Sequence, residues 1–154
     1  MITYHPNENI FDSKAQALVN PVNCVGVAGK GLALEFKKRF PENHAIYENT
    51  CRVGCMQPGI VVPFFTSEKG DSRYIFNFPT KQHWRDQSHI EWIHAGLDSL
   101  VMQTLYRNLY SLAVPRLGCG LGGLQWLDVH AAMREHFAAF SNDICIEIYG
   151  PRVA

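Results

Sequence analysis

Two glycine-rich loops contain the residues of this sequence that are best suited to chemistry. The first reads Asn20-Pro-Val-Asn-Cys-Val-Gly-Val-Ala-Gly-Lys-Gly31, and the second reads Pro115-Arg-Leu-Gly-Cys-Gly-Leu-Gly-Gly123. Each loop follows a short apolar run typical of a strand and leads into a helical pattern. A glycine loop between a strand and a helix presents backbone N–H groups beside a helix N-terminus, and this arrangement binds phosphates. The two loops together predict a cleft that holds a diphosphate from both sides.

Length and composition limit the class of protein. The 154 residues are 47% apolar and 18% charged, which predicts one globular domain over residues 1–154 and excludes a disordered or fibrous chain. The formal net charge is zero, so the chain as a whole does not attract nucleic acid or an anionic membrane. Neither a membrane-spanning apolar run nor a secretory signal is visible in the sequence. We therefore expect a cytoplasmic monomer that has no membrane partner.

Cysteine and histidine spacing argues against a metal site. An odd number of scattered cysteines does not suggest a disulfide framework; they are Cys24, Cys51, Cys55, Cys119 and Cys145. The Cys51–Cys55 pair lacks the second Cys/His pair of a zinc site, and His89 and His94 are five residues apart rather than four. We interpret the cysteines as small apolar side chains in a reducing compartment, and we predict no metal and no cofactor.

Strand-like and helix-like segments alternate along the chain and must position the two loops. The predicted strands cover residues 2–4, 17–22, 59–65, 73–78, 111–115 and 144–149. The predicted helices begin at residue 31, at residue 43, at a capping box formed by Ser88 and Glu91, and after the second loop. This order predicts an α/β fold with three layers, α/β/α, around a central mixed, mostly parallel sheet. Ligands of such sheets bind beyond the carboxyl ends of the strands, where both loops and residues 78–81 should meet.

Two common phosphate-binding motifs fit the loops poorly. Residues 118–123 match the GxGxxG pattern of dinucleotide-binding enzymes, but only one helix and one strand follow them. Residues 26–31 are too short for the nucleoside triphosphate loop, and Gly31 occupies the position of its magnesium-binding Ser or Thr. Neither a nicotinamide-dependent oxidoreductase nor a nucleoside triphosphatase is favoured.

Three separated strings, taken in order, resemble a known family. They cover residues 17–38, residues 77–85 (Asn-Phe-Pro-Thr-Lys-Gln-His-Trp-Arg) and residues 115–126. They are similar to the macrodomains that bind ADP-ribose, in particular to the branch of DarG-like DNA ADP-ribosyl glycohydrolase antitoxins and terminal ADP-ribose glycohydrolases. The resemblance extends over nearly the entire chain and implies the macrodomain fold.

The resemblance also implies a function. It predicts binding of ADP-ribose and metal-independent hydrolysis of the glycosidic bond between ADP-ribose and a modified target, thymine in DNA being favoured. Such an enzyme would act as the antitoxin of a cognate ADP-ribosyltransferase toxin. Two alternatives stay open, which are a non-catalytic ADP-ribose-binding module and a hydrolase of a free ADP-ribose derivative.

The ligand-binding residues follow from the same resemblance. The second loop is expected to wrap the diphosphate, Asn23 to bond the distal ribose, and Tyr149 to pack on the adenine. Asn9 matches a position where macrodomains carry an acidic side chain for the adenine amino group. The expected set is Asn9, Ile10, Asn23, Gly29, Lys30, Gly31, Leu32, Thr80, Pro115, Leu117, Gly118, Cys119, Gly120, Leu121, Gly122, Gly123 and Tyr149. Taken alone, Asn23 is equally consistent with a turn side chain that bonds its own backbone, and Tyr149 with a core ring.

Lys81 is the catalytic residue that the resemblance implies, expected just beyond a strand end. A neutral amine there can attack the anomeric carbon of ribose, which requires a pKa lowered from about 10.4 by burial or by nearby cations such as Arg85. A protonated amine can instead help the leaving group to depart. The alternative is an exposed loop lysine without a catalytic role.

Two further features bear on the substrate. The human relative carries an aspartate in the second loop that resolves a lysine adduct, but Gly122 and Gly123 occupy that region here. We therefore expect Lys81 to act without a long-lived adduct, assisted by the phosphates of the substrate. A DNA contact is expected from His83, Trp84 and Arg85, in which Trp84 stacks on a base. The alternative for Trp84 is a place in the core.

Overall fold

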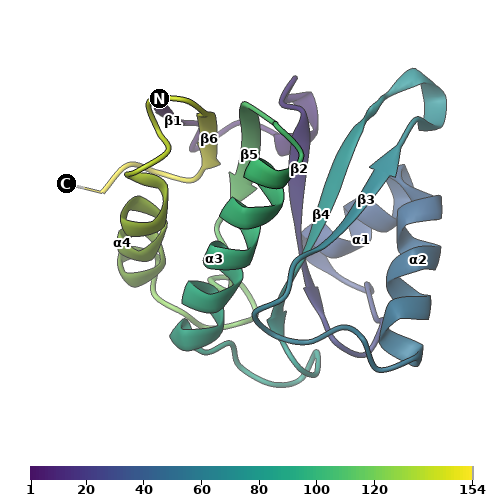
Figure 1. The fold of residues 1–154 in the computed structure, drawn as a ribbon. Coiled ribbons are helices and arrows are strands. Elements are labelled where there is room, and N and C mark those ends of the chain that lie inside the picture. The colour runs from purple at the N-terminus through teal and green to yellow at the C-terminus, as the bar shows by residue number, and fades with distance from the viewer. Residues whose placement is uncertain (154) are drawn as a thin grey trace.

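A six-stranded sheet forms the centre of the computed structural model, which describes residues 1–153 (Figure 1). The order of its strands across the sheet is β1-β6-β5-β2-β4-β3. All neighbouring strands are parallel except β3, which pairs antiparallel with β4. The strands are β1 (Ile2–Tyr4), β2 (Ala17–Asn23), β3 (Val62–Thr66), β4 (Arg73–Lys81), β5 (Ser111–Pro115) and β6 (Cys145–Tyr149).

Helices cover both faces of the sheet, so the predicted three-layer α/β/α fold with a mixed, mostly parallel sheet is confirmed (Figure 1). One layer holds α1 (Gly31–Arg39) and α2 (Pro41–Arg52), and the other holds α3 (Ile90–Tyr106) and α4 (Trp126–Phe137). Two short 3₁₀ helices, η1 (Ile10–Asp12) and η2 (Glu68–Gly70), lie in the connections.

Alternating side chains of the strands fill two cores. In β2, Ala17 and Val19 join the core beneath α3 and α4, whereas Leu18 joins Phe36 of α1 on the opposite face. A strand buried on both faces has a continuous apolar sequence, as residues 17–19 do.

Several predicted boundaries need correction. β3 begins at Val62 rather than residue 59, and Gly59 precedes it with φ +89°, which is not a strand conformation. α2 covers Pro41–Arg52 and so begins before the predicted residue 43. β4 continues beyond residue 78, because its pairing with β2 runs on to Lys81 opposite Asn23. Lys81 is therefore the last residue of a strand rather than a residue beyond it.

The predicted capping box at the start of α3 is wrong. The N-cap residue is His89, and its side chain makes no capping bond. The hydroxyl of Ser88 is buried and has no hydrogen-bond partner among the described residues. The backbone N–H of Ser88 instead donates to the carbonyl of Gly122, 2.9 Å away.

The remaining expectations concern a membrane span, a metal site and the cysteines, all within residues 1–153. None of the helices in this range has the length and apolarity needed to cross a membrane. The same residues contain no group of three or more His, Cys, Asp or Glu side chains that could hold a metal ion, and the five cysteines are free.

A buried cluster of three amides joins β2, α2 and β4. The Asn77 side chain donates to Asn43 at 2.8 Å and to the carbonyl of Val62 at 3.1 Å, while Asn43 and Asn20 each donate to Asn77 Oδ1 at 3.1 Å. Asn77 is 0% exposed. A buried polar group is stable only with such partners, so this cluster fixes α2 against the sheet.

Replacing Asn77 by leucine should cost about 2–4 kcal/mol of unfolding free energy, because the Asn43 and Asn20 amides would remain buried without partners. Urea denaturation followed by circular dichroism measures the loss. Asn49→Leu on the exposed side of α2 is the control and should shift stability by about 0.5 kcal/mol or less. A loss for Asn77→Leu as small as the control's would contradict this role of the cluster.

Candidate functional site

A cavity of about 830 Å³ lies at the edge of the sheet where β2, β4 and β5 end. Its wall is formed by the first glycine-rich loop, the end of β4 with the residues after it, and the second glycine-rich loop. The carboxyl ends of parallel strands are the usual ligand edge of such sheets, and this volume lies within the range typical of small-molecule sites.

Asn23 shapes the first loop. Its Oδ1 accepts from the N–H groups of Val25 (3.1 Å) and Val27 (3.4 Å), and its Nδ2 donates to the Val27 carbonyl at 2.8 Å. The hydroxyl of the buried Tyr47 donates to the same Oδ1 at 2.7 Å. Asn23 therefore has the local turn role that was one of its two interpretations, and it also lines the cavity.

The second loop folds tightly over Ser88, two residues before α3. The Gly118 carbonyl accepts from Leu124 N–H at 3.0 Å, and Gly118 has φ +71°, a conformation that other residues rarely adopt. A Cβ atom at Gly120 would meet nothing within 4 Å, so the backbone there is open to an approaching ligand. Gly118, Gly120, Leu121 and Gly122 all line the cavity.

The cavity is strongly cationic although the chain is neutral overall. Four basic side chains line it, Lys30, Lys81, Arg85 and Arg116, and none of its described lining residues is acidic. Acidic and basic side chains balance over the whole chain, but of these two kinds only basic ones are among the described residues that line this cavity. An anion is therefore the ligand that this lining attracts.

Lys81 lies at one end of this lining. Its Nζ donates to the Trp84 carbonyl at 3.0 Å. Burial lowers the pKa of the Lys81 amine, and the carboxylate of Asp86 opposes that shift. Of the two causes expected from the sequence, burial is therefore the one that acts.

Trp84 is not a core residue, so that alternative is wrong. Its ring is 45% exposed, lies 4.7 Å from the Arg85 guanidinium carbon, and lines the cavity together with Arg85. His83 does not line the cavity; its Nδ1 accepts from the Arg85 N–H at 3.1 Å and holds the turn.

Tyr149 forms the wall farther from Lys81 along the sheet. Its ring stacks on His5 at 4.9 Å between centroids, and its hydroxyl lies 2.9 Å from Glu147 Oε1. Burial, together with the Glu147 hydrogen bond, raises the pKa of Tyr149 to about 12, so the phenol is neutral at physiological pH. Tyr149 also packs against the core beneath α1, so the ring both joins the core and lines the cavity.

The structure gathers most of the expected residues but not all. Outside the lining are Asn9, Ile10, Leu117, Cys119, Gly123 and His83. The side-chain oxygen of Asn9 bonds within its own turn, because Oδ1 accepts from Phe11 N–H at 3.0 Å and caps η1. The expected residues that line the cavity are Asn23, Gly29, Lys30, Gly31, Leu32, Thr80, Lys81, Trp84, Arg85, Pro115, Gly118, Gly120, Leu121, Gly122 and Tyr149.

Sequence reasoning missed some lining residues, namely Pro21, Val22, Val27, Ala28, Ala33 and Arg116. Most are apolar neighbours of expected residues and carry no distinguishing signal. Arg116 could have been found, because it is a basic side chain inside the second glycine-rich loop.

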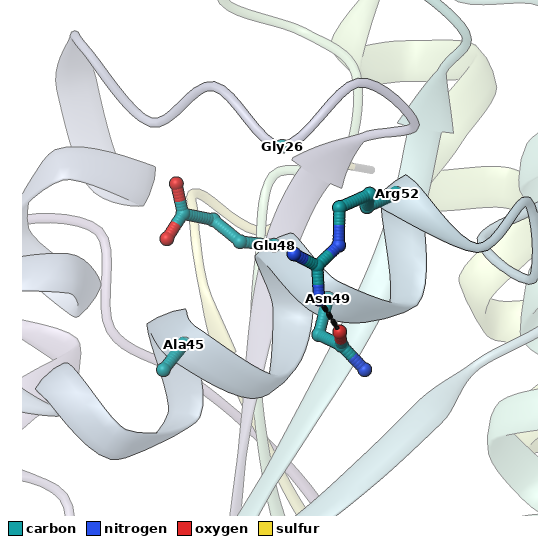
Figure 2. A pocket seen from close by; sticks show the side chains of 5 residues that line it. All are labelled: Gly26, Ala45, Glu48, Asn49 and Arg52. Carbon is teal, nitrogen blue, oxygen red and sulfur yellow. Dashed lines mark hydrogen bonds between the residues drawn. The ribbon is translucent and has the colours of Figure 1, made fainter.

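A second, smaller cavity of about 320 Å³ lies between the first loop and α2 (Figure 2). Gly26 of that loop faces Ala45, Glu48, Asn49 and Arg52 of α2, and Arg52 donates to Asn49. None of these residues lines the larger cavity. The glycine-rich loops and Lys81 do not meet there, so the larger cavity is the candidate site.

Comparison with known proteins gives consistent results. The family model described as Macro domain matches residues 19–133. The DNA ADP-ribosyl glycohydrolase of Mycobacterium tuberculosis is 42% identical over 98% of this chain and 42% of its own length. The solved macrodomain of Mycobacterium tuberculosis DarG is 42% identical, covers 99% of both chains and superposes with a TM-score of 0.93.

A second relative comes from Thermosipho africanus. It is a DNA ADP-ribosyl transferase-DNA ADP-ribosyl glycohydrolase fusion protein, 35% identical over 93% of this chain and 40% of its own length. A structure of Thermosipho africanus DarTG in complex with ADP-ribose matches 95% of this chain and 41% of that one, with 34% identity and a TM-score of 0.86. This chain thus spans about two fifths of the curated relatives described here. The family model and the DarG macrodomain fold together show that the chain belongs to the macrodomain family.

Proposed function

We propose that this chain binds ADP-ribose in the 830 Å³ cavity and hydrolyses the bond between ADP-ribose and a modified target, thymine in DNA being the favoured target. The observation that carries the proposal is the meeting of two glycine-rich loops and a half-buried lysine in one cationic cavity. The name and 42% identity of the mycobacterial relative support the same activity. The reaction reverses ADP-ribosylation and needs no metal.

The cavity has a suitable surface for each part of ADP-ribose. The open backbone of Gly118–Gly122, with Arg116 beside it, is assigned to the diphosphate. Tyr149 is assigned to the adenine, and Asn23 with residues 29–32 to the distal ribose. This assignment directs the anomeric carbon of that ribose toward Lys81, because Asn23 and Lys81 are paired across β2 and β4.

Lys81 supplies the reactive group. Burial lowers the pKa of the amine, and in its neutral form the lone pair bonds to the anomeric carbon as the bond to the base breaks and its electrons leave with the base. The base takes up the proton that the newly bonded nitrogen loses. Water then adds to the same carbon, its proton passes to the nitrogen, and the carbon–nitrogen bond breaks to release the lysine. Since none of the described lining residues is a carboxylate, the phosphates of the substrate assist this second step and the adduct is short-lived.

The residues after Lys81 are assigned to the target. The exposed Trp84 ring offers a stacking surface for a base, and Arg85 offers a cation for a DNA phosphate. Because the chain is neutral overall, the DNA contact involves few phosphates and depends weakly on salt.

The proposal extends to partners and organisation. A cognate ADP-ribosyltransferase would produce the substrate, and the Thermosipho africanus relative, which names both activities in one protein, supports that pairing. We further propose that residues 1–154 form one macrodomain that acts as a cytoplasmic monomer.

Lys81→Ala should lower the rate of ADP-ribose release from a thymidine-modified oligonucleotide by about 100-fold or more, because the nucleophile is lost. Calorimetry should show free ADP-ribose still binding within about 3-fold of the unaltered affinity, since the backbone that holds the diphosphate is intact. The exposed Lys14→Ala is the matched control and should keep full activity.

The unaltered chain distinguishes the alternatives in the same assay. Binding of ADP-ribose without release from DNA or from glutamate-modified protein would favour a binding module. Release only from a free ADP-ribose derivative would favour a metabolite hydrolase.

The pH profile tests the protonation state of Lys81. The kcat for ADP-ribose release should rise with pH and level off at a pKa below the ordinary lysine value, because only the neutral amine attacks and burial lowers its pKa. Single-turnover rates between pH 6 and 10 give the profile. A kcat that falls over this range would show instead that the protonated amine assists the leaving group.

Trp84→Ala should raise KM for the modified oligonucleotide by about 5- to 100-fold, the range expected when one stacked base is lost. The Kd of free ADP-ribose should stay within about 3-fold of the unaltered value, since that ligand contains no target base. Tyr106 is 82% exposed at the far end of α3, so Tyr106→Ala is the aromatic control. Equal losses of affinity for the modified oligonucleotide and for free ADP-ribose would contradict a role of Trp84 in binding the target base.

A further inference from the structure

The hydroxyl of Ser88 is a buried polar group without a partner. Ser88 is 6% exposed, and its Oγ forms no hydrogen bond with any described residue. Native proteins rarely leave such a group unpaired, because desolvation of a hydroxyl is costly unless a hydrogen bond replaces the lost water. Ser88 is also outside the expected ligand set and does not line the cavity.

This hydroxyl lies directly against the second glycine-rich loop. A Cβ atom placed on Gly122 would lie 2.4 Å from Ser88 Oγ, and one placed on Gly118 would lie 3.2 Å from it. The backbone N–H of Ser88 already donates to the Gly122 carbonyl at 2.9 Å. Ser88 therefore packs against the loop outside the cavity lining.

The opposite side of this loop is the one assigned to the diphosphate. The N–H and C=O of a peptide unit point in opposite directions, so a unit that rotates its N–H toward a phosphate rotates its C=O away from it. Glycine allows such a rotation at little cost, since it adopts positive and negative φ almost equally well. The carbonyl would then face Ser88.

We infer that Ser88 is a positioning residue for diphosphate binding, whose hydroxyl donates to a carbonyl of the Gly118–Gly122 turn in the ligand-bound protein. The inference rests on the proposed function, because it takes the diphosphate as the ligand of this turn. The bond exists only with ligand present, so it adds to affinity without adding to the stability of the ligand-free protein.

The same residue connects the diphosphate loop with the reactive lysine. Residues 82–88 connect Lys81 with Ser88. Two hydrogen bonds of 3.0 Å hold the turns of this segment: Lys81 Nζ donates to the Trp84 carbonyl, and Asp86 N–H donates to the His83 carbonyl. The first loop joins this segment through Cys24 N–H and the Gln82 carbonyl at 3.0 Å. Ser88 and Lys81 therefore lie at the two ends of one short, hydrogen-bonded segment.

Ser88→Ala tests the inference by calorimetry with ADP-ribose and by thermal unfolding without ligand. The Kd for ADP-ribose should rise about 3- to 10-fold, the value of one hydrogen bond made only in the complex. The Tm of the ligand-free protein should be unchanged or higher, because an unpaired hydroxyl is removed. Ser88→Thr keeps the hydroxyl and should restore the affinity. Gln87→Ala, at the exposed neighbouring residue, is the control.

The outcomes separate this inference from the function on which it rests. Binding by Ser88→Ala equal to that of the unaltered chain would overturn the inference while leaving the proposed function in place. A lower ligand-free Tm for Ser88→Ala, without rescue of the Kd by Ser88→Thr, would assign Ser88 a purely structural role. If the unaltered chain bound no ADP-ribose, the proposed function would fail first, and the role of Ser88 with it.

Discussion

The parallel pairing of β2 with β4 is the constraint on which the rest of the site depends. The pairing continues along the full length of β2 and ends with Asn23 opposite Lys81. The register shifts between Val22 and Asn23, so the pairing passes over Thr80 and places Lys81, the half-buried amine, opposite Asn23, which shapes the first loop. Both strands are buried between two helical layers, and a shift by one residue would turn their apolar side chains to the wrong faces. The packing of the core thus sets the register up to Val22, and the irregularity that follows sets which residues meet at the cavity edge.

Charge separation within a neutral chain gives the cavity its second property. Lys30, Arg85 and Arg116 line the cavity without a carboxylate in the described lining, and an anion relieves their mutual repulsion. Burial at the same site desolvates Lys81 and lowers the pKa of its amine. Attraction for an anion and the lowered pKa of Lys81 are therefore both properties of this one cavity.

The sequence was sufficient for the features that depend on local pattern. Apolar periodicity predicted the three layers, and glycine spacing predicted which loops meet at the cavity. It was insufficient where a distant strand decides the outcome, since only pairing with β2 extends β4 to Lys81. Ser88 and Glu91 fit the sequence pattern of a capping box, yet Ser88 packs against Gly122 and does not cap the helix. Asn9 was predicted to face the ligand, but its short side chain caps η1 instead.

Recognition of ADP-ribose and recognition of its target place different demands on this structure. A diphosphate held by backbone amides is bound in the same way whatever is attached to the distal ribose, so the glycine-rich loops cannot distinguish one target from another. Discrimination must come from side chains beyond the anomeric carbon. In the proposed assignment, the cavity residues on that side are Trp84 and Arg85. An aromatic ring beside one cation favours the proposed target, a flat base next to a phosphate, over an acidic protein side chain, which would leave the ring in water.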